Sequence, residues 1–213
     1  MYKKYFKRCI DIILSLAGLI LASWLYLIII IAITIDDPGP AFFTQKRVGK
    51  GKKCFQLYKF RSMKTSTPHD IPTHLFKNRK QYITRVGRFL RKSSLDEIPQ
   101  LWNILKGDMS IIGPRPALWN QDDLIAERDK YGANDIRPGL TGLAQISGRD
   151  ELEIPIKAKL DGEYVATLNS GGFKGIAIDI KCFVRTIFSV LKSDGVFEGG
   201  TGTMKEERKK VTK

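Results

Sequence analysis

The segment SSLDEIPQLWNILKGDMSIIGPRP (Ser93–Pro116) places two adjacent carboxylates, Asp96 and Glu97, directly after an arginine-rich stretch. Residues at i and i+1 do not share a helix face, so the two acids are expected to have different surroundings. The spacing S-x-x-E from Ser94 to Glu97 fits a capping box, and Asp96 itself is the other candidate cap. Both alternatives put the acid pair (Asp96 and Glu97) at a helix N-terminus, in a helix that Gly107 ends.

Upstream of this segment the charge is strongly one-sided. Residues 1–92 contain 19 Lys and Arg against 4 Asp and Glu, a net charge of +15, whereas the remainder has 17 against 18, a net charge of −1. Such a distribution favours an anionic partner: phospholipid, nucleic acid or a phosphorylated substrate. The three cysteines are far apart and include no C-x-x-C, which indicates neither a disulfide framework nor a zinc site. His69 and His74 are interpreted as a surface pair.

The N-terminal region carries an apolar run, Ile12–Ile35, of 24 residues without a charge. As a helix it would be roughly 36 Å long, enough to cross a hydrocarbon core of about 30 Å. The run is too long for the h-region of a secretory signal. Lysines and arginines flank it on both sides, which a spanning helix rarely shows. A re-entrant helix broken near Ser23, with both ends on one membrane face, and a spanning helix both remain open.

Short elements follow. Residues 41–48 and 54–63 flank a Gly-Lys-Gly-Lys turn and predict a β-hairpin, and residues 65–78 predict a polar loop. The stretch from Ile83 predicts a basic helix loosened at Gly87. Apolar residues at i, i+3 and i+4 between Ile180 and Leu191 predict an amphipathic helix, packed on the core or lying on a membrane surface. The fold class is therefore α+β, with a membrane helix at 1–36, a mainly helical domain at 37–196 and a polar tail at 197–213.

The residue types around the acid pair suit phosphoryl transfer. A carboxylate at a helix N-terminus is kept ionised and ready to attack, and a neighbouring one is a natural Mg²⁺ ligand. Basic residues that could clamp phosphoryl oxygens flank the pair in sequence: Arg88, Arg91, Arg115, Arg137 and Arg149. Adjacent acids at helix starts are also common as plain caps, so these residues alone leave a structural role open.

Five ordered blocks resemble the bacterial initiating sugar transferases, specifically the small monotopic phosphoglycosyl transferases. The resemblance covers about residues 2–196, and its blocks are FKRCIDI (6–12), KFRSM (59–63), SLDEIPQLWNILKGDMSIIGPRP (94–116), RPGLTGLAQISGR (137–149) and KLDGEYV (159–165). It implies transfer of a sugar phosphate from a UDP-sugar to polyprenyl (undecaprenyl) phosphate, with release of UMP. This reaction is the first membrane step of surface glycoconjugate biosynthesis, and it takes place at the cytoplasmic face of the bacterial inner membrane.

The resemblance also implies roles for individual residues. Asp96 would form a covalent phosphosugar intermediate in a ping-pong reaction, and Glu97 would hold Mg²⁺. The residues expected to shape the donor pocket are Lys59, Arg88, Arg115, Arg137, Arg149 and Asp161. The family's re-entrant helix breaks at a Ser-Pro pair; here Ser23 is present but Trp24 replaces proline, so the kink is expected from back-bonding of Ser23 and from packing.

The partners expected on this interpretation are the UDP-sugar, the polyprenyl phosphate and membrane lipids, with no nucleic acid, and a homo-oligomer is compatible with the sequence. A different class of function is a membrane-anchored basic module that binds anionic lipid or nucleic acid without catalysis. Such a module would lose binding steeply with salt and would be indifferent to Asp96.

Overall fold

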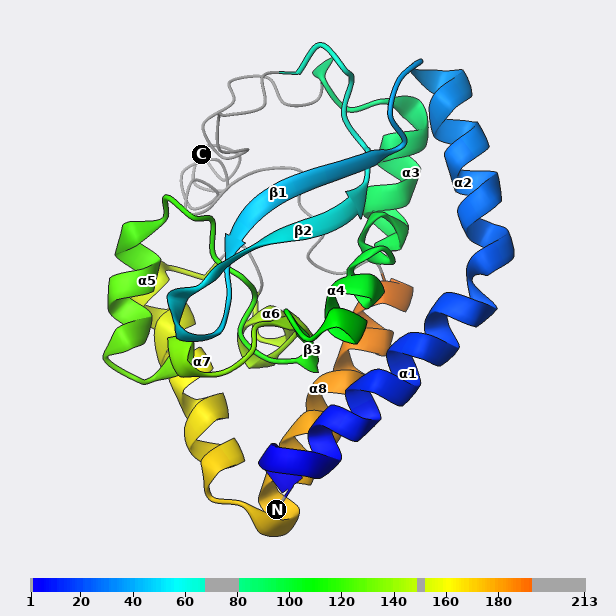
Figure 1. Cartoon of the computed structure of the whole chain (residues 1–213). Coiled ribbons are helices and arrows are strands. Elements are labelled where there is room, and N and C mark those ends of the chain that lie inside the picture. Colours follow the sequence, from blue (N-terminus) through cyan, green and yellow to red (C-terminus); the bar gives the residue numbers. More distant parts are fainter. Residues whose placement is uncertain (1, 68–80, 149–151, 193–213) are drawn as a thin grey trace, which may run out of the picture.

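A computed structural model describes residues 2–67, 81–148 and 152–192, and it confirms the α+β class (Figure 1). The predicted polar loop from residue 68 onward, His69, His74 and the predicted tail lie outside these ranges. The chain runs in the order η1 (Tyr2–Phe6), α1 (Lys7–Leu21), α2 (Ser23–Asp36), β1 (Phe42–Val48), η2 (Lys50–Lys52), β2 (Cys54–Phe60), α3 (Arg85–Ser93), η5 (Leu95–Glu97), α4 (Gln100–Lys106), β3 (Ser110–Ile112), α5 (Asp122–Asp129), η6 (Ala133–Asp135), β4 (Gly139–Thr141), α6 (Leu143–Ile146), α7 (Ile154–Asn169) and α8 (Gly172–Lys192).

The apolar run forms two helices instead of one. The segments Tyr2–Leu21 and Ser23–Asp36 meet at a bend of 59°, at Ala22, one residue before the predicted position. Within the described residues no single helix has the length and apolar character to span a bilayer, whereas the bent pair taken together meets both criteria.

Packing against two different partners accounts for this bend. At Gly18, α1 passes so close to α4 that an added Cβ would lie 2.9 Å from Leu101 Cδ1. The end of α2 instead meets the start of α3, where the Asp36 carboxylate accepts a hydrogen bond from the Val86 N–H at 2.8 Å. Among the described residues Ser23 makes no side-chain hydrogen bond, so the expected back-bonding does not contribute.

The hairpin prediction is confirmed, with strand ends that differ slightly. Strands β1 and β2 are antiparallel, with Phe42 opposite Phe60 and Val48 opposite Cys54. The Phe60 ring is buried between those of Tyr26 and Phe42, with centroid distances of 5.0 and 5.2 Å. The hairpin is thereby packed onto α2, and its second strand ends three residues before the predicted Met63.

The prediction of a loosened helix at Gly87 is wrong. Helix α3 is continuous from Arg85 to Ser93, and the Thr84 hydroxyl caps it by accepting from the Gly87 N–H at 2.9 Å. A Cβ at Gly87 would lie 2.0 Å from the Ser62 carbonyl oxygen, so the glycine is needed for the close approach of two backbones.

The main core lies where α4, β3, α7 and α8 meet, and it includes two buried acids. Its apolar members include Ile104, Met109, Tyr164 and Cys182. Asp11 accepts from the Ser110 hydroxyl at 2.8 Å and from the Ile111 N–H at 3.0 Å. Asp179 accepts from the hydroxyls of Tyr2 and Tyr164 and pairs with Lys7. Since buried charges are stable only with such partners, these bonds fix α1 and α8 against the core.

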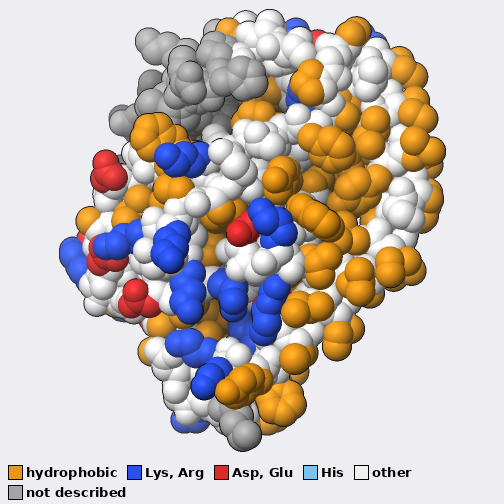
Figure 2. Space-filling model, in the orientation of Figure 1, with side chains coloured by type: hydrophobic (Ala, Val, Ile, Leu, Met, Phe, Trp, Pro, Cys, Tyr) orange, Lys and Arg blue, Asp and Glu red, His pale blue; other side chains and the backbone are white. Residues whose placement is uncertain are grey.

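The predicted apolar stripe of α8 faces outward. Asp179 and Cys182 point into the core, whereas Phe188 is 59% exposed and Ile180, Phe183, Val184 and Ile187 are also exposed; the side chain of Leu191 is not described. The core-packing interpretation of this stripe is therefore wrong. Figure 2 shows that hydrophobic side chains also gather on the surface along α1 and α2.

Candidate active site

The acid pair lies in the first turn of the short 3-10 helix η5, between α3 and α4, and not at the N-terminus of an α-helix. Ser94 closes α3 in a left-handed conformation (φ 58°), Leu95–Glu97 form the turn, and α4 begins at Gln100 after Pro99. Neither the turn nor α4 has a side-chain cap. Both capping alternatives are therefore wrong, because Ser94 serves to end α3 and proline at position 99 supplies no N–H for a cap to bind.

Asp96 is a buried carboxylate beside a lysine. Its exposed fraction is 8%, and its Oδ2 lies 4.0 Å from the Lys59 Nζ of β2. Burial raises the pKa of Asp96, and the nearby charges of Lys59, Arg91 and Arg115 oppose that rise. The expected influence of a helix dipole on this carboxylate stays a prediction, whereas the three cationic side chains favour its ionised form.

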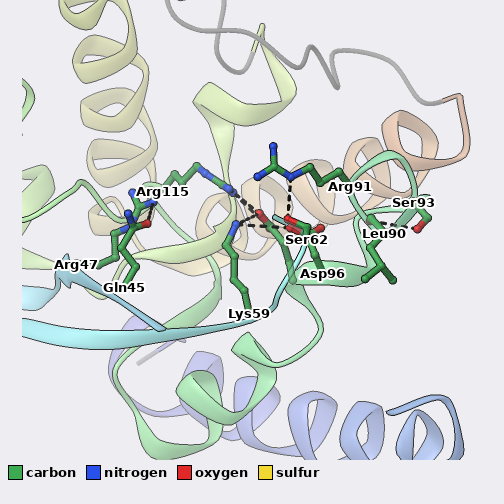
Figure 3. A network of polar contacts seen from close by, with 10 residues as sticks. Gln45, Arg47, Lys59, Ser62, Leu90, Arg91, Ser93, Asp96 and Arg115 are labelled. Atoms are coloured by element: carbon green, nitrogen blue, oxygen red, sulfur yellow. Dashed lines mark hydrogen bonds and ion pairs between the residues drawn. The ribbon is translucent and has the colours of Figure 1, made fainter. Parts of the chain in front are cut away.

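Glu97 has the opposite electrostatic environment. Its Oε1 accepts from Lys59 Nζ at 2.7 Å and from an Arg115 guanidinium nitrogen at 2.6 Å, and its Oε2 lies 3.4 Å from the other Arg115 nitrogen. Burial opposes ionisation, but Arg115 and Lys59 outweigh it and hold the pKa of Glu97 well below its usual range. Figure 3 shows Lys59 and Arg115 reaching toward the acid pair from different sides. The two adjacent acids therefore have different environments, as their positions in sequence predict.

The loop that carries Arg115 is fixed by backbone contacts. Strands β3 and β4 are parallel, and the Gly139 N–H donates to the Pro114 carbonyl at 2.8 Å. A Cβ at Gly139 would lie 2.1 Å from the Gly113 nitrogen, so only glycine allows this approach. Arg128 adds a hydrogen bond of 2.9 Å to the Arg115 carbonyl oxygen.

Asp161 acts on this loop from inside the protein. It is 1% exposed and its Oδ2 accepts from Arg128 Nε at 2.8 Å and from Arg128 Nη2 at 2.6 Å. Burial raises the pKa of Asp161, and Arg128 opposes that rise. The contacts therefore run from Asp161 through Arg128 to the backbone of Arg115, and the Asp161 side chain is not at the pocket surface.

Of the predicted site residues, the structure brings together Lys59, Asp96, Glu97 and Arg115. Arg88 has an exposed side chain on α3, and Arg91 points toward the acid pair instead, donating from Nε to the Ser62 hydroxyl at 2.8 Å (Figure 3). Arg137 lies elsewhere, donating to the Gly107 carbonyl oxygen. Arg149 lies outside the described residues.

Two supporting residues had not been singled out from the sequence. Arg128 lies in the charged helix α5, and no sequence motif includes it. Asn103 is fully buried; it accepts from the Tyr58 N–H at 3.0 Å and donates to the Gln56 carbonyl at 2.7 Å, which fixes β2 and its Lys59 against α4. An amide in the middle of a short apolar helix is the only signal that could have indicated it.

The donor set for a divalent cation is small. Within the described ranges, no group of three or more His, Cys, Asp or Glu side chains comes together. Asp96 and Glu97 nevertheless meet the minimum for Mg²⁺, which commonly binds one or two carboxylates together with substrate phosphates and water. A cation here would therefore depend on the substrate for most of its ligands.

Comparison with known proteins identifies the family. A family model described as bacterial sugar transferase matches residues 2–193, and the chain belongs to this family. It is 36% identical over 209 residues to the undecaprenyl-phosphate galactose phosphotransferase of Salmonella typhimurium, a match that covers 91% of this chain and 42% of that protein.

Two further relatives match in the same range. A UDP-glucose:undecaprenyl-phosphate glucose-1-phosphate transferase of Caulobacter vibrioides is 37% identical over 199 residues, covering 90% of this chain and 72% of that protein. An uncharacterized sugar transferase, EpsL, of Bacillus subtilis is 36% identical over 190 residues, a match that covers 89% of this chain and 89% of that protein. The chain thus spans less than half of the Salmonella relative but most of the Bacillus one.

Proposed function

We propose that the protein is a phosphoglycosyl transferase that moves a sugar phosphate from a UDP-sugar to polyprenyl phosphate. The names of the Salmonella and Caulobacter relatives support the reaction class. The single observation that carries the proposal is the buried Asp96 carboxylate beside Lys59, with Arg115 fixed on the adjacent glutamate. A non-catalytic basic module would have no need for a carboxylate in this costly position.

In the first half-reaction an oxygen of the Asp96 carboxylate attacks the phosphorus that bears the sugar. A bond forms between that oxygen and phosphorus, and the bond from this phosphorus to the bridging oxygen breaks, so that UMP leaves with the electron pair. In the second half-reaction a phosphate oxygen of the polyprenyl phosphate attacks the same phosphorus and releases the Asp96 carboxylate. This ping-pong sequence needs only one nucleophile from the protein, Asp96, because the acceptor phosphate enters the same site after UMP has left.

The surrounding cations stabilise the charge that develops on the phosphoryl oxygens. Lys59 and Arg115 are held in place by Glu97 before the substrate arrives, so little reorganisation is needed. Arg91 is the further cation that we place at the donor, in preference to Arg88. Asp161 serves as a positioning residue through Arg128 and the backbone of Arg115.

Glu97 would hold Mg²⁺ while sharing its carboxylate with Lys59 and Arg115, and Asp96 is the second available carboxylate. When bound, the ion would neutralise charge on the diphosphate of the donor.

We place the enzyme at the cytoplasmic face of the bacterial inner membrane, with α1 and α2 as a re-entrant pair. The bend at Ala22, basic residues on both flanks and the exposed apolar face of α8 support this arrangement. Lys4→Cys, made in a background with the three native cysteines replaced, tests the topology. A membrane-impermeant maleimide should leave Cys at position 4 unlabelled in intact cells and label it in inverted vesicles; labelling in intact cells would mean a spanning helix.

The covalent step is tested with the donor alone. We expect incubation with a UDP-sugar and Mg²⁺, followed by acid quench and digestion, to add the mass of one sugar phosphate to the peptide containing Asp96. Asp96→Asn is the matched control and should gain nothing. An unmodified peptide in a preparation that turns over with polyprenyl phosphate would contradict the covalent mechanism.

A further inference from the structure

A second cationic site lies at the opposite end of α4 from the acid pair. A pocket there, here called the basic pocket, brings together five cationic side chains from distant parts of the chain: Lys3, Lys7, Arg8, Lys50 and Arg137. The helix between the two sites has seven residues, which separates them by roughly 10 Å or more. Figure 2 shows Lys and Arg side chains gathered on one face of the protein, beside the hydrophobic side chains along α1.

The two arginines of the basic pocket are held by carbonyl groups and not by carboxylates. Arg8 donates to the carbonyl oxygens of Ile104 and Leu105 at 2.6 and 2.9 Å, and Arg137 donates to that of Gly107 at 2.9 Å. Burial lowers the pKa of Arg8, and the nearby charge of Arg137 lowers it further. Two like charges are therefore fixed near each other, and the partial negative charge of a helix C-terminus offsets them only in part.

The acids near the basic pocket do not cancel its charge. Asp11 lies close enough to Arg8 to favour its charged form, but the carboxylate oxygens of Asp11 already accept from Ser110 and Ile111. Asp179 pairs with Lys7. Asp135 lines the pocket as an exposed acid, and within the described ranges neither Arg8, Arg137 nor Lys50 forms an ion pair.

We propose that the basic pocket is a binding site for a phosphate group, separate from the reaction site and formed by Arg8, Arg137, Lys3 and Lys50. The two guanidinium groups provide fixed charge, and Lys3 and Lys50 add charge from exposed positions. Lys3 donates to the Asn169 side-chain oxygen at 2.5 Å and would exchange this bond for one to the anion. The phosphate could belong to an anionic lipid, since Tyr5 and Phe6 next to the pocket are exposed, or it could be free in solution.

Titration calorimetry of the full chain in neutral detergent tests this site. The background is Arg115→Gln, so that phosphate binding at the acid pair is weakened. The probes are inorganic phosphate, dihexanoyl phosphatidylglycerol and, as a lipid without net charge, dihexanoyl phosphatidylcholine. We expect one of the first two to bind, and Lys3→Gln with Lys50→Gln to weaken that binding about tenfold.

A charge-matched control separates the pocket from general electrostatics. Lys64→Gln with Lys159→Gln removes two exposed lysines elsewhere and should leave the dissociation constant within about twofold. Arg137→Gln is a second test of the pocket, with thermal unfolding used to verify that the variant is folded. Because Lys3 and Lys50 are near the surface, their double variant remains informative if Arg137→Gln does not fold.

Each outcome has a defined meaning. Weakening by the pocket variants with phosphatidylglycerol alone identifies a lipid headgroup site, and weakening with inorganic phosphate identifies a site for free phosphate. Absence of binding by both anions, an equal loss with the control variant, or equal binding of phosphatidylcholine would overturn the proposal. These results do not depend on the proposed transfer reaction, because no donor or acceptor is present.

Discussion

The two ends of α4 hold arginine in contrasting ways. At the N-terminal end Arg115 and Lys59 share the Glu97 carboxylate, so that their charge is balanced and their positions are fixed. At the C-terminal end Arg8 and Arg137 donate to carbonyl oxygens. Because these oxygens carry only partial negative charge, they do not neutralise the two guanidinium groups. The first arrangement preorganises cations around the proposed nucleophile, whereas the second leaves positive charge for the proposed phosphate ligand and also stabilises the helix end.

The largest expected effect comes from replacing Asp96, the proposed nucleophile. Asp96→Asn should lower UMP release from a UDP-sugar by at least ~10³-fold, because a neutral amide oxygen cannot form the phosphoryl bond. UMP release is measured with and without polyprenyl phosphate. Asp129→Asn, at an exposed acid paired with Lys52, is the control and should retain turnover. Substantial UMP release by Asp96→Asn would remove the nucleophile from the mechanism.

Glu97→Gln should have the next largest effect. Gln keeps the size of the side chain but cannot neutralise Lys59 and Arg115, and it is a poorer ligand for a cation. We expect kcat/KM to fall about 100-fold and the dependence on Mg²⁺ to weaken. Glu127→Gln, in an exposed pair with Lys130, should change neither quantity. A fully active Glu97→Gln enzyme would reduce Glu97 to a structural residue.

Arg8→Gln tests the other end of the helix. It removes two charge-assisted hydrogen bonds to the last carbonyls of α4, so the free energy of unfolding should fall by about 2 kcal/mol. Chemical denaturation in detergent measures this change. Arg185→Gln removes the same charge from an exposed position of α8, and stability should be nearly unaffected. Equal stability of the two variants would mean that Arg8 does not support the helix end.

Lys59→Met is expected to shift the pH profile. Attack requires ionised Asp96, so activity falls as the pH drops through the pKa of that carboxyl, which burial raises and Lys59 lowers. Without Lys59 this pKa rises further, and the acid limb of kcat/KM should move to higher pH. Lys53→Met, at the exposed turn of the hairpin, is the control and should leave the limb in place. An unmoved limb in Lys59→Met would mean that Lys59 does not tune Asp96.

The smallest expected effect is a gain in stability for the inactive Asp96→Asn protein. Burial raises the pKa of Asp96 in the folded state above its value of about 4 in the unfolded chain. The ionised carboxylate therefore destabilises the folded state at a pH above the folded-state pKa, and this cost disappears at a pH below about 4. Replacement by neutral Asn should therefore add about 1 kcal/mol at pH 8, and the gain should vanish toward pH 4. Thermal unfolding at the two pH values measures it.

Asp129→Asn gives the opposite sign in the same measurement. Hydrogen bonds from Asn134 and Lys52 lower the pKa of Asp129, so its ionised form favours the folded state at pH 8. Its replacement should lower the melting temperature slightly. A gain of the same size in both variants would show that the effect does not come from the local environment of Asp96.

Local signals in the sequence predicted the elements whose determinants are local. The turn between the strands and the helix end at Gly107 depend on a few neighbouring residues, whereas the bend near Ser23 was predicted from local residues but depends on the packing of α1 against α4 and of α2 against α3. The capping box did not form because Ser94 adopts a left-handed conformation that ends α3. The need for glycine at position 87 within the continuous helix α3 comes from Ser62, a residue 25 positions away that no local pattern reveals.

The residue types of the candidate site could be predicted from the sequence, but the contacts between these residues could not. Asp96, Glu97, Lys59 and Arg115 come together as the resemblance implies. The placement of Arg137 at the other end of α4 and the link from Asp161 through Arg128 depend on how β3, β4 and α7 pack. Burial also reverses the expected influence on the Asp96 pKa, and burial follows from tertiary packing and not from sequence position.

The hydrogen bonds of Asp11 have a mechanical consequence. With one carboxylate oxygen on Ser110 and the other on Ile111, α1 cannot rotate about its long axis or slide along β3 without leaving a buried charge unsatisfied. The orientation of the apolar helix surface relative to the acid pair is therefore set when the chain folds. If α1 lies in a lipid leaflet as proposed, the height of Asp96 above the acyl chains would be set by the way α1 is held against β3.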